Sequence, residues 1–233
     1  VLGGPMDPGC PAWGHFEGMK ITVQDLFEAA ALTVSGKMSQ EEAKYLENIC
    51  CGPGACSGMF TAMTMQCLTE AIGMTIPYMA TAQATGMERS RLAYEAGLKV
   101  MELLNRGITP RKIMTEAAFR NAITVDMALG GSTNTVLHLK AVAEECGIDL
   151  PLDLFDEIGK STPHLCNMAP AGPMKIVDLH AAGGIPGVVK TLEARLDTGV
   201  ITATGRSLGE NLKDVKVYDR EVIRPLDNPV HET

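Results

Sequence analysis

The sequence predicts an α/β fold that is rich in helix and holds only a small, mainly parallel sheet. Apolar residues recur at helical spacing through most of the 233 residues, whereas few short segments alternate as strands do. Apolar residues make up 45% of the chain, which is enough to fill a hydrophobic core. The opening Val1-Leu2 runs into a glycine turn, as strands of α/β domains do at their carboxyl ends.

Capping residues and glycines delimit the expected helices. Thr22 begins a helix that Gly36 ends, and Ser39 with Glu42 forms a capping box that begins a second, short helix. Thr109 followed by proline marks another helix start. Further helices are expected from residue 56 or 57 to about 74, over 87–105, from 110 to 130, over 133–146 and 152–160, and as short helices over 176–182 and 186–196.

Strand signals are confined to Val1-Leu2, residues 200–203 and residues 215–217. The first residue is not methionine, and residues 223–233 are extended and interrupted by prolines. We therefore expect residues 1–233 to be an incomplete N-terminal α/β domain cut from a longer protein, with the C-terminal domain absent.

Composition excludes several classes of function. A net charge of −8 and a pI near 5.2 argue against a nucleic-acid partner, because phosphate backbones are bound by clustered Lys and Arg. No run of about 18 apolar residues and no secretory signal is present, so we expect no membrane partner and a cytoplasmic protein. Seven cysteines, an odd number, are typical of reduced thiols, some of them metal ligands.

The segment 47–60 holds three of these cysteines among three glycines. Cys56, at the expected start of a helix, is the first candidate for a metal ligand, because a helix N-terminus stabilises a thiolate. Adjacent Cys50 and Cys51 cannot easily bind the same metal, so Cys50 is the second candidate. A structural zinc site fits less well, since no Cys-x-x-Cys pair exists, and the alternative is that these cysteines are ordinary apolar residues.

Two further segments carry polar side chains. Gly131, Ser132, Thr133 and Asn134 follow Gly130 between two expected helices, where the amides of a helix N-terminus either bind an anion or are merely capped by a hydroxyl. Downstream, His164, Cys166, Asp178 and His180 are possible acid–base or ligand groups, although a histidine between apolar neighbours is more often structural.

Four segments, in the same order, resemble the dihydroxy-acid dehydratase and 6-phosphogluconate dehydratase family. They are Gly3-Gly4-Pro5-Met6, the cysteine segment continuing through Ser57-Gly58-Met59-Phe60-Thr61-Ala62, the string over 130–139, and the stretches over 161–170 and 174–186. The resemblance implies that Cys56 is an iron–sulfur ligand and that Gly131, Ser132, Thr133 and Asn134 bind a substrate carboxylate. Cys51 stands where the family usually has proline.

The resemblance also implies an activity. Members are hydro-lyases that dehydrate 2,3-dihydroxy acids to 2-oxo acids, and these strings are most similar to members of branched-chain amino-acid (valine, isoleucine) biosynthesis. Sugar-acid or 6-phosphogluconate dehydration is the alternative within the family, and a non-catalytic thiol metal-binding module is an alternative of another class.

The cofactors that the family implies are a [2Fe–2S] or [4Fe–4S] cluster and Mg²⁺. The catalytic base is expected downstream of residue 233 and the other ligands upstream, so we expect these residues alone to be inactive and to retain neither cofactor. The expected partners are a small dihydroxy acid and a second copy of the protein.

Overall fold

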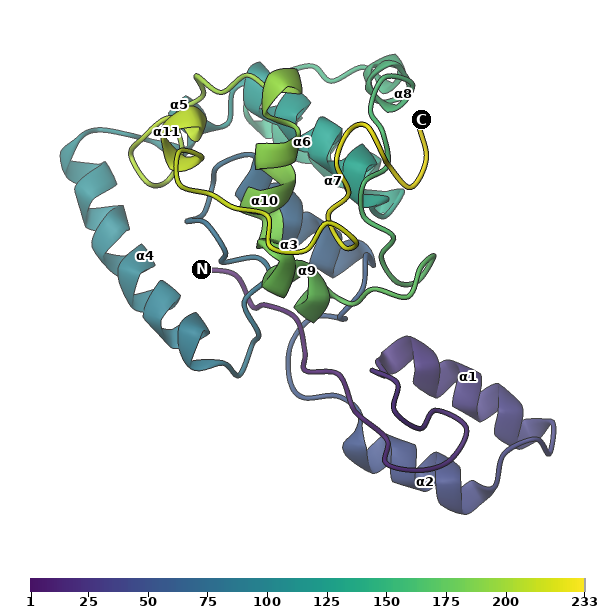
Figure 1. Ribbon diagram of the computed structural model, residues 1–233. Coiled ribbons are helices and arrows are strands. Elements are labelled where there is room, and N and C mark those ends of the chain that lie inside the picture. The colour runs from purple at the N-terminus through teal and green to yellow at the C-terminus, as the bar shows by residue number, and fades with distance from the viewer. Residues whose placement is uncertain (233) are drawn as a thin grey trace.

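The computed structural model describes residues 1–232, and helices build nearly all of it (Figure 1). In chain order they are α1 (Val23–Val34), α2 (Gln40–Ile49), α3 (Thr61–Ala71), α4 (Met87–Asn105), α5 (Pro110–Ile113), α6 (Glu116–Leu129), α7 (Asn134–Glu145), α8 (Leu152–Gly159), α9 (Ile176–Ala182), α10 (Gly184–Thr191), a 3₁₀ turn η1 (Glu193–Arg195) and α11 (Leu208–Asn211).

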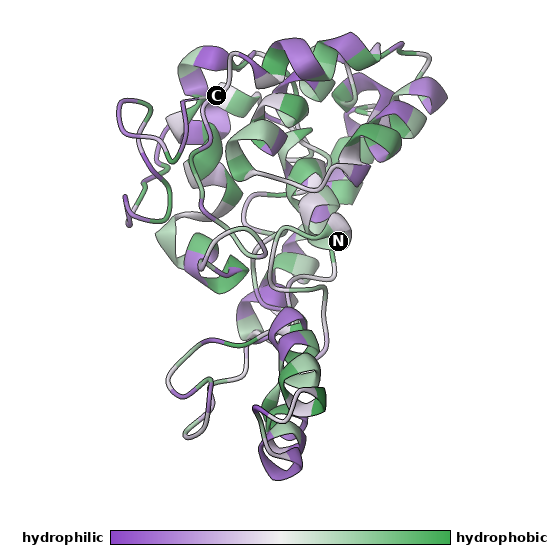
Figure 2. Cartoon of the chain, turned by 90° about the vertical axis from the view of Figure 1, so that its right-hand side faces the viewer, coloured by the Kyte–Doolittle hydropathy of each residue, from purple (hydrophilic) through white to green (hydrophobic). Residues whose placement is uncertain are grey.

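The first two helices form an arm that projects from the rest of the chain in both Figure 1 and Figure 2. The arm has a hydrophobic core of its own, made of Phe16, Ile21, Ala29, Met38 and Leu46. The predicted N-caps Thr22 and Ser39 are confirmed here, but the capping box of Ser39 is only half formed, since the Glu42 carboxylate accepts from the His15 amide instead. The Ser39 hydroxyl accepts a hydrogen bond from the amide of Glu42 at 3.1 Å, and the Asp25 carboxylate accepts one from the amide of Thr22 at 2.6 Å.

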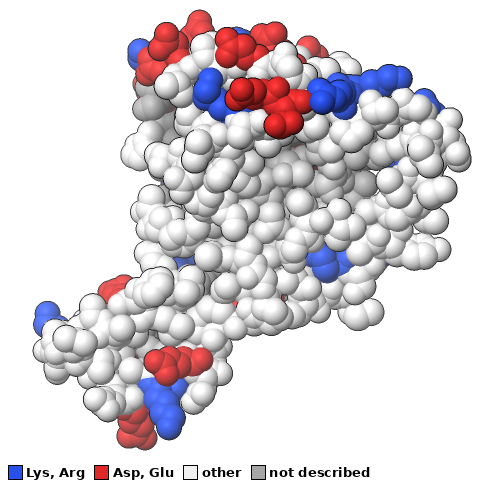
Figure 3. Space-filling view, turned by 180° about the vertical axis from the view of Figure 1, so that it is seen from behind, with Lys and Arg blue, Asp and Glu red and all other residues white. Residues whose placement is uncertain are grey.

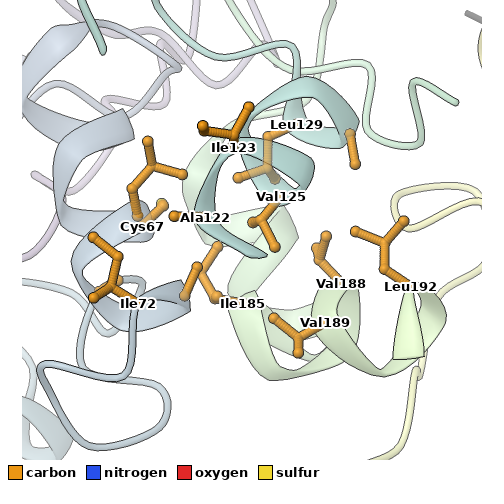
Figure 4. Packing of buried hydrophobic residues seen from close by; sticks show 14 of the residues in the cluster. Cys67, Ile72, Ala122, Ile123, Val125, Leu129, Ile185, Val188, Val189 and Leu192 are labelled. Atoms are coloured by element: carbon orange, nitrogen blue, oxygen red, sulfur yellow. The ribbon is translucent and has the colours of Figure 1, made fainter. Parts of the chain in front are cut away.

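The main core lies where α3, α6 and α10 meet, which places it between segments far apart in the sequence (Figure 4). α6 is buried along nearly its whole length, so it is the central helix of the body. The core side chains labelled in Figure 4 are Cys67, Ile72, Ala122, Ile123, Val125, Leu129, Ile185, Val188, Val189 and Leu192. No helix within residues 1–232 is long and apolar enough to cross a membrane.

The expected small parallel sheet is wrong for residues 1–232, where only isolated bridges occur, such as the parallel bridge of Pro5 to Ala55 and the antiparallel bridge of Ile201 to Ser207. Of the three segments with strand signals, only residues 200–203 form a bridge, at Ile201, while Val1-Leu2 and residues 215–217 form none. The alternating apolar residues over 215–217 pack their side chains onto the main core instead of entering a sheet. The fold is therefore helical, with extended connections.

Most expected helices are confirmed, some with the predicted bounds, as for α4 and α9. Three differ. α3 begins at Thr61, later than expected. The helix expected from Pro110 is two helices, α5 and α6, because the Thr115 hydroxyl accepts a hydrogen bond from the amide of Ala118 at 3.3 Å and so forms a new N-cap for α6. α10 is shorter than expected and ends before η1.

Candidate functional site

The cysteine segment is held against the opening turn of the chain. The Met6 amide donates to the Ala55 carbonyl, and the Ala55 amide donates to the Gly4 carbonyl, both at 2.8 Å. Gly54, with φ +139°, passes so close that a Cβ there would lie 2.7 Å from the Met6 amide nitrogen. Glycine is therefore required at this position, and the turn before Cys56 is fixed by backbone contacts.

Cys56 is half-buried, so its thiol is neither packed inertly in the core nor fully exposed. The expectation that it lies at a helix N-terminus is wrong, because Phe60 is the N-cap of α3 and four residues separate Cys56 from Thr61. The field of that helix falls off within its first turn and does not reach the thiol in the way the sequence suggested. Cys56 remains the first candidate for a metal ligand because its thiol is partly accessible and its segment contacts the other candidate segments.

Cys50, the second candidate, is joined to Cys51 in a disulfide, whereas the sequence indicated reduced thiols. A sulfur in a disulfide is not a thiolate, so Cys50 can bind a metal only after reduction. Cys10, Cys56, Cys67, Cys146 and Cys166 are free.

The turn over 131–134 lies at the N-terminus of α7, as predicted. Gly130 ends α6 in the left-handed conformation, with φ +61°, and the chain reverses into Thr133, the N-cap of α7. The Ser132 hydroxyl lies 3.2 Å from the Thr61 hydroxyl, and the Asn134 side-chain amide donates to that Thr61 hydroxyl at 2.7 Å. The start of α3, directly after the cysteine segment, is thus joined to this turn.

A buried carboxylate lies beneath the same turn. Asp126 accepts a hydrogen bond from the Thr135 hydroxyl at 2.5 Å through Oδ2, while its buried Oδ1 has no partner. Burial raises the pKa of Asp126 to about 6, and the bond from Thr135 opposes that rise only in part. Ser57, next to Cys56, likewise has a buried hydroxyl without a partner. Two orphaned polar atoms therefore flank the candidate site.

The segment around Cys166 reaches the cysteine segment as well. The Met59 amide donates to the Ala169 carbonyl at 2.6 Å, and the Ile176 amide donates to the Ser57 carbonyl at 3.0 Å. A Cβ at Gly58 would lie 2.8 Å from the Ala169 carbonyl oxygen, so this close approach needs glycine. All four segments singled out in the sequence are therefore linked, in a chain of contacts that runs through residues 55–61.

The polar residues of the last segment are held by neighbours in the fold. His164 Nε2 lies 2.9 Å from the Cys166 carbonyl oxygen, and burial lowers the pKa of this histidine. Asp178 pairs with Lys20 of the arm and accepts from the Lys175 amide, and His180 lies between the Thr81 hydroxyl and the Glu88 carboxylate, 2.9 Å from each. His180 and Asp178 therefore have structural partners.

Thiol chemistry decides which residues could hold a cofactor. Iron–sulfur clusters are bound by several thiolates, and Cys56 fits one such position. Cys166 is the other free thiol whose segment is bonded to this loop. It is buried, and burial raises its pKa to about 12. Within residues 1–232 no group of three or more Cys, His, Asp or Glu side chains is arranged to hold a metal.

Comparison with known proteins agrees with the four segments. A family model described as "Dihydroxy-acid/6-phosphogluconate dehydratase N-terminal" matches residues 1–211. Relatives named dihydroxy-acid dehydratase are 47% identical in Methanobrevibacter smithii, 46% in Methanothermobacter thermautotrophicus and 49% in Caldanaerobacter subterraneus subsp. tengcongensis. The matches cover 99–100% of this chain but only 42% of the length of each relative. On this match the chain belongs to the dihydroxy-acid/6-phosphogluconate dehydratase family.

Proposed function

We propose that residues 1–233 are part of the N-terminal domain of an enzyme that dehydrates 2,3-dihydroxy acids to 2-oxo acids. In this reaction C2 loses a proton and C3 loses hydroxide, and the resulting enol tautomerises to the 2-oxo acid. The observation that carries the proposal is the linkage of the Cys56 segment to the turn over 131–134 through Thr61. It puts the thiol proposed to bind a metal and the helix end proposed to bind an anion in one region.

The substrate carboxylate is assigned to the turn over 131–134. The Thr133 amide has no acceptor within residues 1–232 and lies at the positive end of α7. The hydroxyls of Ser132 and Thr61 and the amide of Asn134 already bond to one another, which holds them in place before a ligand arrives. A preorganised set of donors binds an anion with less loss of entropy.

Cys56 is assigned as one ligand of an iron–sulfur cluster, with the other ligands from elsewhere. When bound, such a cluster would act as a Lewis acid toward the leaving hydroxyl, and Mg²⁺ would neutralise the carboxylate side of the substrate. The residues described here would contribute the thiolate, the turn that binds the substrate carboxylate and the packing that excludes water. The base is proposed to come from outside residues 1–233, and these residues alone to be inactive.

The substrate class is proposed to be dihydroxy acids, in accord with the names of the relatives, and within that class the branched-chain acids. Sugar acids and 6-phosphogluconate remain the alternative within the family. Figure 3 shows a face where charged side chains gather along one edge and on the arm, with few between them, and the net charge is −8. These observations support a small-molecule substrate over nucleic acid. We propose the cytoplasm as the location.

A titration with small ligands tests whether the turn over 131–134 binds the substrate carboxylate. Adding 2,3-dihydroxy-3-methylbutanoate to the isotope-labelled chain should shift the amide resonances of Ser132, Thr133 and Asn134, and gluconate should shift them less. Ser132→Ala should weaken the response several-fold, because its hydroxyl orders the turn. Ser161→Ala, an exposed serine at the end of α8, is the matched control. Equal responses in both variants would contradict the assignment.

Cobalt binding tests the thiol. After reduction, Co²⁺ should give a thiolate charge-transfer absorption that Cys56→Ser removes and that Cys10→Ser, which changes an exposed cysteine, leaves intact. If Cys56→Ser retains the absorption, Cys56 is not the ligand. A purified chain that forms 2-oxo acid unaided would contradict its proposed inactivity, and a tightly bound zinc would favour the non-catalytic module.

A further inference from the structure

A polar cavity of about 330 Å³ opens where α6, the end of α8 and the segment after η1 meet. It lies along the N-terminal half of α6, with Arg120 and Thr124 in its wall, whereas the turn over 131–134 follows the opposite end of that helix. Thr124 precedes Gly130 by about 9 Å along the helix axis, and Arg120 precedes it by about 15 Å. The cavity shares no residue with the candidate site, and its volume accommodates a small organic molecule.

The three walls of the cavity are held to one another by hydrogen bonds. The Asn121 side-chain amide donates to the Asp197 carbonyl, and the Asn121 side-chain oxygen accepts from the Asp197 amide, both at 2.9 Å. These two bonds join α6 to the segment after η1. Arg195 donates to the Ser161 carbonyl at 2.6 Å, which joins η1 to the end of α8. The lining is therefore set by the fold before a ligand binds, which lowers the entropy cost of binding.

Two exposed arginines, Arg120 and Arg195, belong to this lining. Within residues 1–232 no carboxylate oxygen lies within 4.0 Å of either guanidinium, whereas Arg91 and Arg106 each pair with a glutamate. Arg195 uses one N–H on the Ser161 carbonyl, and the Arg120 side chain donates to no described group, so most of their donors are available. Planar guanidinium groups are suited to a phosphate, whose oxygens accept from several donors at once.

The polar hydroxyls of the lining offer acceptors instead of donors. Thr124 is 7% exposed, and its hydroxyl donates to the Arg120 carbonyl at 3.0 Å. Thr162 is 4% exposed, and its hydroxyl donates to the Ile158 carbonyl at 2.8 Å. Because a hydroxyl has one proton and that proton is already used, only its lone pairs remain for a ligand. Such lone pairs match the hydroxyl groups of a ligand, which donate.

Asp197 adds a carboxylate to the same lining. Its Oδ1 accepts from the Gly199 amide at 2.9 Å, and its Oδ2 accepts no hydrogen bond from any group within residues 1–232. A carboxylate repels a bare anion, but it accepts hydrogen bonds from the hydroxyl groups of a polyol. The lining as a whole therefore selects a molecule that carries a phosphate at one end and several hydroxyl groups at the other.

We propose that this cavity is a second small-molecule site, which binds a phosphorylated polyol such as a sugar phosphate. Arg120 and Arg195 bind the phosphate group. Thr124, Thr162 and Asp197 accept hydrogen bonds from the hydroxyl groups. Hydrogen bonds to charged groups are the stronger ones, so the arginines supply most of the affinity and the hydroxyl contacts supply the selectivity over inorganic phosphate. The proposal does not depend on the proposed function, because it concerns residues away from the candidate site.

Ribose 5-phosphate is the probe for this site. Added to the isotope-labelled chain, it should shift the amide resonances of Asn121, Thr124 and Asp197 until they saturate. Inorganic phosphate should bind at least about tenfold more weakly, because it lacks the hydroxyl contacts. No saturable shift with ribose 5-phosphate, or equal affinity for inorganic phosphate, would overturn the proposal. Shifts confined to Ser132 and Asn134 would place the probe at the candidate site instead and would also overturn it.

Arg120→Gln tests the phosphate contact. It should weaken the binding of ribose 5-phosphate by at least about tenfold, since a charge-assisted bond is lost. Arg111→Gln makes the same change of charge at an exposed arginine of α5 and should leave binding unchanged. Both variants should keep the free energy of unfolding of the parent, because neither side chain bonds to a described group. If the two variants weaken binding equally, the probe responds only to net charge, and the proposal is wrong.

Thr124→Val tests the hydroxyl contact, because it keeps the branched shape of the side chain and removes its oxygen. Ribose 5-phosphate should bind several-fold more weakly to this variant, and inorganic phosphate should bind as it does to the parent. Thr191→Val is the matched control, since the Thr191 hydroxyl likewise donates to a carbonyl one turn earlier in its helix, that of Gly187 at 3.0 Å, and lies outside the cavity. Unchanged binding of ribose 5-phosphate to Thr124→Val, or an equal loss with both ligands, would overturn the proposal.

Discussion

Gly131→Ala tests whether the backbone of the turn over 131–134 is set by the carboxylate beneath it. A Cβ at this position would lie 1.9 Å from Oδ1 of Asp126 and 2.6 Å from Cγ2 of Thr64. The Gly131 φ is outside the left-handed region, so the cost is steric. Asp126 is 4% exposed and Thr64 is fully buried, so neither side chain can swing into solvent.

The expected magnitude follows from that geometry. Ordinary contact requires the Asp126 oxygen to withdraw by about 1.5 Å into a filled core. Overpacking of this kind costs about 2–3 kcal/mol in the free energy of unfolding. Urea denaturation of Gly131→Ala should show that loss, while Gly3→Ala, where a Cβ meets nothing within 4 Å, should stay within about 0.5 kcal/mol of the parent.

A double-mutant cycle identifies the cause. If the clash is with the carboxylate, Asp126→Ala should relieve it, and the double variant should be more stable than the sum of the single effects predicts by at least about 1 kcal/mol. Additive effects would mean that Asp126 does not set the turn. A Gly131→Ala variant as stable as the parent would refute the close contact itself.

Three further predictions concern stability and are measured by urea denaturation. Burial raises the pKa of Asp126 to about 6, so its protonated form stabilises the fold by up to about 3 kcal/mol below pH 4, a contribution lost as the pH rises through 6. Asp126→Asn should therefore flatten the pH profile, and an unchanged slope would contradict this. Thr115→Ala should cost about 1 kcal/mol through loss of the α6 cap, but Thr109→Ala, whose hydroxyl caps nothing, should cost little. Arg89→Met should cost about 3 kcal/mol because three backbone carbonyls lose their donor, whereas the exposed Arg120→Met should be nearly neutral, and equal costs would contradict the role of Arg89.

Local signals in the sequence account for most of the helices. Ser39 and Thr22 were recognisable as N-caps because hydroxyl residues favour that position, and Gly36 and Gly130 as helix ends because glycine readily adopts the left-handed conformation. The Ser207–Glu210 capping box of α11 carries the same signal and was missed, since it opens only one turn of helix.

The sheet could not be predicted correctly, because strand pairing depends on contacts between distant residues. Apolar alternation over 215–217 is compatible with a strand and equally with an extended segment that packs on helices. In the structure the segment packs on the main helical core. The start of α3 was misplaced for a related reason. Residues 57–60 were expected to form its first turn, yet the Ser57 carbonyl and the Met59 amide bond to Ile176 and Ala169 across the chain. These bonds to distant residues hold the segment outside the helix.

The candidate site was predictable in its parts and not in its assembly. Cys56, Ser132 and Asn134 were named from local pattern, but nothing local indicates that Thr61 joins them. Asp126 was missed as well, because an acidic residue within a predicted helix is normally expected to lie on its exposed face. Its burial follows only from the position of α6 at the centre of the body.

The glycines of the cysteine segment show how one residue type carries different constraints. Gly52, Gly54 and Gly58 all lie in the one segment that holds Cys50, Cys51 and Cys56. In the structure Gly54 alone has a positive φ, and both Gly54 and Gly58 are needed where another backbone passes within 3 Å of a Cβ position. Gly52 meets nothing closer than 3.6 Å. The segment is therefore anchored by close packing rather than loose, and a rigid turn is what a thiol needs in order to present one fixed ligand position to a metal.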